Sequence, residues 1–288
     1  MIMMSFQCHR NHNIQYLPFV QGMIIGASSF AGSFPELKQV VESIELYIPK
    51  LGVYEGTKLV KSRVKKIRDF LSTCELSTSI HAPYFNDAPN YPHELIVDTA
   101  HLNKTQIRLL KESITMADEL GSSVVVIHPG RIDTDRSRSS DSMVSGLSRI
   151  ARFAQDRNVM LGLENKVGTD PKNLCSQASE LINAIEQIGS PSLRATLDIG
   201  HANLTCGGDS SKLRDFVREI KEYVVHVHIH DNGGMLNEKY WGDFHGAPGS
   251  GGIDFSVLKE LDFDGVYNLE VFSIEDVRAG RRVLEGLI

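Results

Sequence analysis

VMLGLENKVGTDPKNLCSQASELINAIEQIGSPSLRATLDIGH, residues 159–201, shows the pattern from which the rest of the chain is built. Short apolar runs stand at its two ends, at 159–164 and 193–198, and residues 173–188 between them carry apolar side chains at helical spacing. An apolar strand, a helix and a second apolar strand in this order form a βαβ unit, whose two strands lie parallel. The stretch therefore predicts a parallel sheet with crossover helices.

The same alternation continues toward both ends of the chain. Runs rich in Val, Ile and Leu recur at 23–27, 43–48, 78–82, 123–128, 159–164, 193–198, 224–230 and 265–270. Helical spacing fills the gaps at 57–74, 105–120, 141–157, 173–188, 210–222, 254–261 and 274–286. Eight such strands alternating with helices in 288 residues predict a single (β/α)8 TIM barrel. An open doubly wound sheet is the alternative, but GASSFAG after the first run matches a phosphate-binding loop poorly.

Composition places few limits on function. The chain is 41% apolar and 23% charged, which is ordinary for a globular protein, and its net charge of −6 offers no global attraction to nucleic acid or to an anionic membrane. No apolar run approaches the roughly 20 residues that span a membrane. The four cysteines, Cys8, Cys74, Cys175 and Cys206, are far apart and form no C-x-x-C pair, which favours idle thiols in a reducing cytoplasm.

The first 22 residues differ from the rest of the chain. They lack the apolar core of a signal peptide and show no clear helical or strand period. We therefore expect an N-terminal extension over 1–22, partly disordered, followed by the barrel over 23–288. Cys8, His9 and His12 are able to bind a metal, but a polar tail is the preferred interpretation.

Histidines and acidic residues stand where the predicted strands end. Six consecutive strands end in or near such a residue, namely His81, His128, Glu164, Asp198, His228 with its neighbours His226 and His230, and Glu270. His201 follows Asp198 by three residues, and the loop 231–252 adds Asp243 and His245. Barrel enzymes form their active sites at the carboxyl ends of the strands, so these side chains are expected to meet there. One alone would more often be a helix cap or a core hydrogen-bonding residue, but six in succession indicate a site.

The residue types at these strand ends are those of a metal site. Imidazole nitrogens and carboxylates without cysteine suit Zn²⁺, Mn²⁺ or Fe²⁺. His226, His228 and His230 share one face of their strand because side chains alternate along it. His226 lies lowest and is interpreted as a core histidine, whereas Asp243 and His245, two residues apart, are able to hold one ion together.

These motifs carry a resemblance to a known family. The ordered set HAPY, HPG, LEN, LDIGH, HIHDN, DFH with PGSGGID, and LEV resembles the xylose isomerase-like TIM-barrel superfamily and, within it, the endonuclease IV branch, over residues 23–270. The resemblance implies up to three zinc ions and nine ligands, which correspond here to His81, His128, Glu164, Asp198, His201, His228, Asp243, His245 and Glu270. His228 is assigned because the family pattern of His, two residues and Asp matches His228 to Asp231, with His230 as the alternative.

The match is uneven around the ligands. The E-N-T-A-G-x-G pattern of the family appears here as ENKVGTD, D-[ST]-C-H-x-F as DIGHAN, and H-L-N-D as HIHD. These departures leave the ligands intact and change their surroundings, so they bear on the DNA substrate more than on the metals. Tyr84 and Phe85 follow His81 where the family places side chains that wedge into DNA, although two aromatics can equally roof a barrel.

The resemblance implies a phosphoester hydrolase that uses a metal-activated water. Glu164 would bridge two ions and act with Glu270 as a catalytic residue, while Asp198 completes the cage of that pair. His201, Asp243 and His245 would hold the third ion. Candidate substrate-binding residues are Tyr84, Phe85, His230 and two cations that directly follow the HPG and EN motifs, Arg131 and Lys166, for which a solvated surface charge is the alternative. A phosphoester, a phosphorylated sugar or abasic DNA is the expected substrate.

Two other functions remain open from the sequence. A sugar or sugar-phosphate isomerase or epimerase of the same superfamily would use one metal ion, Zn²⁺ or Mn²⁺, on Glu164, Asp198, His228 and Glu270. Such an enzyme does not need His81, His128, Asp243 or His245 as ligands, so their presence favours hydrolysis. A metal-stabilised binding barrel without catalysis would instead have a closed coordination sphere.

Overall fold

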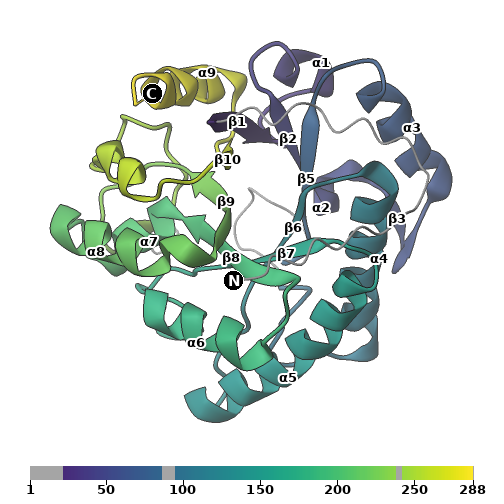
Figure 1. The fold of residues 1–288 in the computed structure, drawn as a ribbon, viewed down its shortest axis with the longest axis horizontal. Helices are drawn as coiled ribbons and strands as arrows, with labels where there is room; N and C mark the ends of the chain where they lie inside the picture. The colour runs from purple at the N-terminus through teal and green to yellow at the C-terminus, as the bar shows by residue number, and fades with distance from the viewer. Residues whose placement is uncertain (1–21, 86–94, 238–241, 288) are drawn as a thin grey trace, which may run out of the picture.

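The computed structural model describes residues 22–85, 95–237 and 242–287 and shows one closed barrel surrounded by helices (Figure 1). The barrel strands are β1 (Met23–Ser28), β2 (Ser43–Tyr47), β5 (Ser77–His81), β6 (Val124–Ile127), β7 (Met160–Glu164), β8 (Leu193–Asp198), β9 (Val224–Ile229) and β10 (Gly265–Leu269). Each pairs in parallel with the next in this order, and β10 pairs with β1, so the barrel sheet closes on itself. The predicted single (β/α)8 barrel is confirmed.

Helices connect the strands on the outside of the barrel. The longer ones are α3 (Lys61–Leu71), α4 (Lys104–Leu120), α5 (Arg136–Gln155), α6 (Ala178–Ile188), α8 (Ser210–Ile220) and α9 (Ile274–Glu285). The shorter elements are α1 (Phe34–Leu37), α2 (Ile48–Leu51), the hairpin of β3 (Tyr54–Glu55) and β4 (Lys58–Leu59), α7 (Ile199–Thr205), and the 3-10 helices η1 (Lys221–Tyr223) and η3 (Phe255–Glu260). Within the described ranges, no helix is both long enough and apolar enough to cross a membrane.

The strands agree with the sequence more closely than the helices do. Every predicted strand is present and shifted by at most one residue at either end. The helix predicted over 57–74 begins only at Lys61, because the residues before it pair in the β3–β4 hairpin. The helix predicted over 254–261 is the 3-10 helix η3, and α7 was not predicted at all. The expectation for residues 1–22 falls almost entirely on residues 1–21, which lie outside the described part of the chain.

Alternation along the strands separates an apolar layer from a polar barrel interior. In β2, Ile44 and Leu46 are fully buried in the hydrophobic core that packs the strands against the helices. Glu45 between them points the other way, because successive side chains of a strand face opposite sides of the sheet. It lies in the interior, where it meets side chains of β1, β5, β9 and β10. The polar interior leads directly to the mouth.

Candidate metal centre

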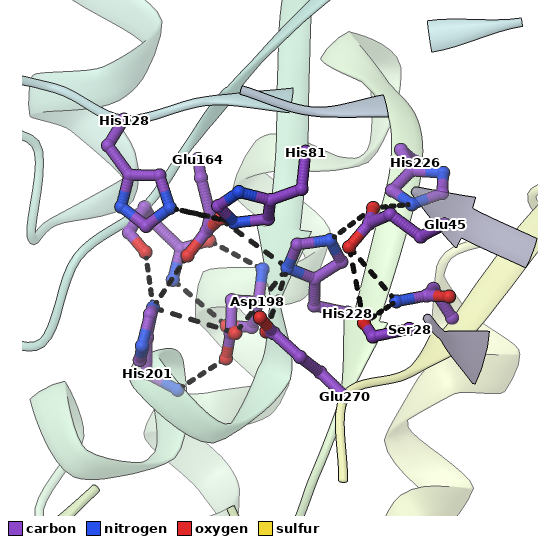
Figure 2. A network of polar contacts seen from close by, with 12 residues as sticks. Ser28, Glu45, His81, His128, Glu164, Asp198, His201, His226, His228 and Glu270 are labelled. Atoms are coloured by element: carbon purple, nitrogen blue, oxygen red, sulfur yellow. Dashed lines mark hydrogen bonds and ion pairs between the residues drawn. The ribbon is translucent and has the colours of Figure 1, made fainter. Parts of the chain in front are cut away.

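The strand ends that carry histidines and carboxylates meet at one end of the barrel, in a connected polar network (Figure 2). His81, Glu164 and Asp198 are the last residues of β5, β7 and β8, while His128 and Glu270 directly follow β6 and β10. His228 lies within β9, and His201 in α7. These seven are buried, whereas Asp243 and His245, in the loop after β9, are partly exposed. The structure therefore brings together all nine residues expected as ligands.

A first donor group consists of His81, His128 and Glu164. The Nε2 atoms of the two histidines lie 3.1 Å apart. Oε2 of Glu164 lies 3.2 Å from Nε2 of His128 and 3.9 Å from Nε2 of His81. Neighbouring ligands of a tetrahedral ion with bonds of about 2.1 Å are about 3.4 Å apart, so one ion fits among these atoms.

A second donor group surrounds Nδ1 of His228. Oε2 of Glu270 lies 3.1 Å from this nitrogen, Oε2 of Glu164 lies 3.4 Å from it, and Oδ2 of Asp198 lies 3.9 Å from it. The Glu164 oxygen is the same one that faces the first group. The two groups therefore share a carboxylate, which is the arrangement expected of a bridging ligand.

A third donor group lies on the loop side of the mouth. Oδ2 of Asp243 lies 3.1 Å from Nε2 of His201 and 3.5 Å from Nε2 of His245. His230, predicted as a substrate contact or as the alternative to His228, lies beside this group, with Nε2 placed 3.6 Å from Oδ1 of Asp243. The same nitrogen is 3.1 Å from Oδ1 of Asp198, so His230 stands between the second and third groups.

His230 fits because of a glycine on the neighbouring helix. A Cβ atom on Gly200 would lie 2.0 Å from the His230 ring, so any other residue there would collide with it. The ring stacks on His245 with centroids 4.0 Å apart. Gly200 and His230 belong to DIGHAN and HIHD, two motifs that depart from the family pattern. The two departures therefore accommodate each other in space.

Hydrogen bonds fix which nitrogen of several histidines faces the mouth. Nδ1 of His81, His201 and His245 lies 3.0, 2.8 and 2.8 Å from the backbone carbonyls of Ala82, Asn165 and Glu270 respectively. A carbonyl only accepts hydrogen bonds, so Nδ1 carries the proton in each neutral ring and Nε2 is left as an electron-pair donor. Metal-binding histidines are oriented in this way by partners on the other nitrogen.

Several buried polar atoms of these groups have no hydrogen-bond partner in the described part of the chain. They are Nδ1 of His128 and of His228, both ring nitrogens of His230, Oε2 of Glu164, Oδ2 of Asp198 and Oδ1 of Asp243. A buried polar atom without a partner is costly, and so many in one place require a shared partner. A cation satisfies electron-pair donors that face one another at ligand spacing. The residues present therefore fit divalent metal ions.

The charges of Glu164 and His128 agree with this interpretation. Burial raises the pKa of the Glu164 carboxyl, but the surrounding histidines, with His128 foremost, outweigh it and hold that pKa well below its usual value. Burial also lowers the pKa of His128 well below that of an ordinary histidine. An ionised carboxylate and a neutral imidazole are the forms that bind metal. Burial lowers the pKa of His201, His228 and His245, but neighbouring carboxylates outweigh it and raise that pKa above the usual histidine value, so a metal ion would displace protons there.

Asp231 holds the loop that carries Asp243 and His245. Its Oδ2 accepts hydrogen bonds from the backbone N–H groups of Gly249 and Gly251, each at 2.9 Å. A Cβ atom on Gly251 would lie 2.4 Å from Oδ1 of Asp231, so glycine permits this close approach. The HIHD and PGSGGID motifs therefore act as one unit that returns the loop to the barrel.

His245 has an unusual backbone conformation at the end of this unit. Its φ is 47°, in the left-handed region that side chains other than glycine rarely adopt. Residues kept in that region cost on the order of 1 kcal/mol and concentrate at functional sites. The bond from Nδ1 to the carbonyl of Glu270 holds the ring toward Asp243 at this position.

The candidate substrate-binding residues differ in their burial and in their contacts. Tyr84 is buried and stacks on His128 with ring centroids 4.1 Å apart, and Phe85 packs beside it at 4.5 Å. Arg131 is engaged by Oδ2 of Asp170 at 2.8 Å and by Asn173. Lys166 is buried, and its Nζ lies 5.2 Å from the centre of the Tyr84 ring.

Sequence reasoning missed Glu45, Asn165 and the role of Asp231. Glu45 is completely buried and touches His228 from the side away from the mouth (Figure 2). Asn165 donates to the carbonyl of Asp198 and accepts from the Asp198 N–H, and so joins the ends of β7 and β8. A signal for Glu45 existed, because a charged residue interrupts the apolar run SIELYI. Nothing local distinguishes Asn165.

Comparison with known proteins shows which family has this barrel and which proteins the chain is similar to. The profile of the xylose isomerase-like TIM barrel family matches residues 38–287. An uncharacterized protein of Methanocaldococcus jannaschii is 30% identical over 81% of this chain and 78% of its own length. A probable endonuclease 4 of Mycoplasma mobile is 27% identical over 74% of this chain and 75% of its own. A D-tagatose 3-epimerase-like protein of known crystal structure has a TM-score of 0.75 and 27% identity, over 92% of this chain and 97% of its own.

Proposed function

The chain belongs to the xylose isomerase-like TIM barrel family, and on that premise we propose that it is a divalent-metal-dependent phosphoester hydrolase that uses a metal-activated water. The family contains enzymes whose reactions differ, as a relative named as an endonuclease and a neighbour named as epimerase-like show. The choice between them depends on the site. Zn²⁺ suits its nitrogen and carboxylate donors best, and Mn²⁺ is the alternative.

One observation carries the proposal: the mouth holds more donors than one ion can use. Three groups of inward-facing nitrogen and carboxylate atoms share the mouth, and Oε2 of Glu164 serves two of them. A four-coordinate ion takes four ligands, and the second group alone supplies four. The remaining donors, above all His81, His128, Asp243 and His245, have no role in a centre with a single ion. Neighbouring ions suit the transfer of a phosphoryl group.

Metal ions in such a centre lower the pKa of a water and neutralise charge on the phosphoryl oxygens. The protein supplies the frame for this. Glu164 ties the first two groups together from the end of β7, and Glu270 faces the second from the end of β10. The third group, on α7, β9 and the loop after it, is held against the barrel by Asp231. This frame would hold three metal positions on one rim of the barrel.

Lys166 is the better candidate for a phosphate contact. Burial lowers the pKa of Lys166, but the nearby Glu164, Asp243 and Asp198 raise it by a larger amount. The side chain therefore stays charged next to the donor groups. The guanidinium of Arg131 is instead held by Asp170 at 2.8 Å. We therefore propose that Lys166 attracts the phosphate and that Arg131 stabilises its own loop. Tyr84, stacked on His128, would line the first donor group rather than wedge into DNA.

The proposal is tested by assaying protein loaded with Zn²⁺ or with Mn²⁺. The substrates are an aryl phosphodiester, an abasic-site DNA duplex, and a panel of ketoses and ketose phosphates. The test variant is the double substitution Asp243→Asn, His245→Ala, which removes two donors of the third group. The matched control is Asp209→Asn, because Asp209 is an exposed helix cap and asparagine also caps helices.

We expect wild type and the control to cleave at least one phosphoester. The double variant should lose on the order of 10³-fold in kcat/KM, as when a group of a catalytic unit is removed. Interconversion of sugars by wild type, with no phosphoester cleavage under either metal, would overturn the proposal.

A single-metal sugar epimerase is the second candidate, and the second donor group favours it. Glu164, Asp198, His228 and Glu270 form a complete four-ligand set without help from the other two groups. In that case the loop with Asp243 and His245 would mainly cover the substrate. The double variant would then raise KM for a sugar more than it lowers kcat.

A further inference from the structure

We propose that Glu45 is a positioning residue that holds His228 with its Nδ1 electron pair directed at the second donor group. Glu45 belongs to the barrel interior rather than to the mouth, and it faces His228 from the opposite side of the ring (Figure 2). The inference rests on the metal centre of the proposed function and assigns a role to a residue outside that centre.

Hydrogen bonding fixes the tautomer of His228. Nε2 of His228 lies 3.0 Å from Oε2 of Glu45. An ionised carboxylate only accepts hydrogen bonds, so Nε2 must carry the proton. A neutral imidazole has one proton, so Nδ1 is left with its electron pair exposed. This is the nitrogen that lies 3.1 Å from Glu270 and 3.4 Å from Glu164.

Glu45 is itself fixed from several sides. The oxygen that contacts His228 also lies 3.0 Å from Nε2 of His226. The other oxygen accepts from Oγ of Ser28 and from Nδ2 of Asn268, both at 3.3 Å. These partners come from β1, β9 and β10, while Glu45 lies on β2. The carboxylate is completely buried, so solvent cannot take its place.

His228 differs in this respect from the other oriented histidines. His81, His201 and His245 use backbone carbonyls, which remain after any side-chain substitution. His228 depends on a side chain that is negatively charged. A carboxylate partner raises the basicity of a metal-binding imidazole in addition to orienting it, and losing such a partner typically costs 10–100-fold in metal affinity. The second donor group should therefore respond to Glu45 although Glu45 does not belong to it.

The test measures metal affinity rather than turnover. Metal-free Glu45→Gln protein is titrated with Zn²⁺ against a competing chelator, and the same is done for wild type, His228→Ala and the double variant. Glutamine keeps the shape and one acceptor oxygen but removes the charge. The matched control is His226→Gln, which keeps an N–H donor for the same Glu45 oxygen and removes a ring that contacts His228 but belongs to none of the three donor groups.

We expect Glu45→Gln to weaken one binding step by 10–100-fold and to leave the others unchanged. The weakened step should be the one that His228→Ala removes, and Glu45→Gln should add nothing in the His228→Ala background. His226→Gln should bind metal as wild type does. Unchanged affinity in Glu45→Gln, an equal loss in His226→Gln, or the same loss in the absence of the His228 ring would each overturn the proposal.

A second readout needs no Glu45 variant, so it remains available if Glu45→Gln does not fold. In zinc-loaded wild-type protein, the ring proton of His228 should be seen on Nε2 by ¹H–¹⁵N NMR, assigned by its loss in His228→Ala. A proton on Nδ1 would overturn the proposal. Both readouts are independent of the reaction. Metal binding that depends on Glu45 without phosphoester cleavage would contradict only the proposed function.

Discussion

Two buried glutamates on opposite sides of one histidine show the difference between a structural and a ligand-like carboxylate. Glu45 lies in the barrel interior, and both of its oxygens accept hydrogen bonds, from His226, His228, Ser28 and Asn268. Glu164 lies at the mouth, and its Oε2 has no hydrogen-bond partner in the described part of the chain although three histidine nitrogens face it. Residue type and burial are the same in both places.

The difference lies in the balance of donors and acceptors. Around Glu45, each acceptor meets a proton that a serine, an asparagine or a histidine can supply. Near Glu164, Nδ1 of His81 is hydrogen-bonded to a backbone carbonyl, so its Nε2 carries an electron pair rather than a proton. That electron pair faces Nε2 of His128 and the Glu164 carboxylate. A cation is the partner that such a place lacks. The Glu45 carboxylate is therefore fully paired, although Nδ1 of His226 and Oδ1 of Asn268 beside it have no partner in the described part of the chain, and the larger number of unpaired donor atoms lies at the mouth.

The largest effect should follow from substituting Glu164. Glu164→Gln removes the carboxylate shared by two donor groups, and we expect turnover to fall by about 10³-fold or more. The barrel should still fold, as circular dichroism would show, because Glu164 ends its strand outside the apolar layer. Activity close to wild type in a folded Glu164→Gln protein would contradict the assignment of the whole site.

The next largest effect should separate the two glutamates by stability. Glu45→Ala leaves buried histidine nitrogens and an asparagine without their acceptor, and we expect the free energy of unfolding to fall by roughly 3–5 kcal/mol. Glu164→Ala in metal-free protein should cost less, because its oxygen toward the donor groups makes no hydrogen bond. Urea denaturation of both variants after metal removal measures this. A larger loss of stability in Glu164→Ala than in Glu45→Ala would contradict the interpretation of Glu45 as the structural carboxylate.

The same contrast explains what could be predicted from the sequence. A strand end can be recognised from residues that are adjacent in the sequence. The runs that end at His81, Glu164 and Asp198 therefore predicted both the fold and most of the mouth. Glu45 was missed because its partners lie on four other strands, and those on β9 and β10 are distant in sequence. The position of His230 beside Asp198 and Asp243 was not predicted, since it depends on Gly200 on the neighbouring helix. The helices after β2 and β9 were misjudged because hairpin and 3-10 geometry interrupt the helical spacing.

A smaller effect should appear when metal-free protein is titrated with base. Burial lowers the pKa of His245, but Asp243 and Glu270 outweigh it and raise the pKa to about 9. A histidine with a folded pKa above its unfolded value of about 6.5 stabilises the protein fully below pH 6.5, and that stability is lost as the pH rises to 9. The loss amounts to roughly 3 kcal/mol at most.

Denaturation of metal-free wild type and His245→Ala between pH 6 and pH 9 measures this loss. The variant should lose less stability over that range. Zinc-loaded protein should show little of the slope, because the metal takes the place of the proton. If the unfolding free energy of wild type and of His245→Ala fell equally with pH, His245 would not be a histidine with a raised pKa.

The smallest effect concerns the loop rather than the donors. In Asp231→Asn, the amide nitrogen cannot accept the bonds from Gly249 and Gly251, and we expect a loss of about 1–2 kcal/mol in stability. Metal affinity should fall only at the third group, by a few fold. The control is Asp254→Asn, which retains a capping side chain at η3. A loss at the first group instead would show that the loop does more than carry Asp243 and His245.

The number of metal ions per chain tests the central claim most directly. The protein is purified without chelator, equilibrated with Zn²⁺ or Mn²⁺, freed of excess metal, and analysed for its elemental content per folded chain. Three donor groups, two of which share Glu164, predict two or three ions, and Glu164→Gln should lower that number. A single ion in metal-replete wild-type protein would contradict the account and leave only the second donor group as a metal site.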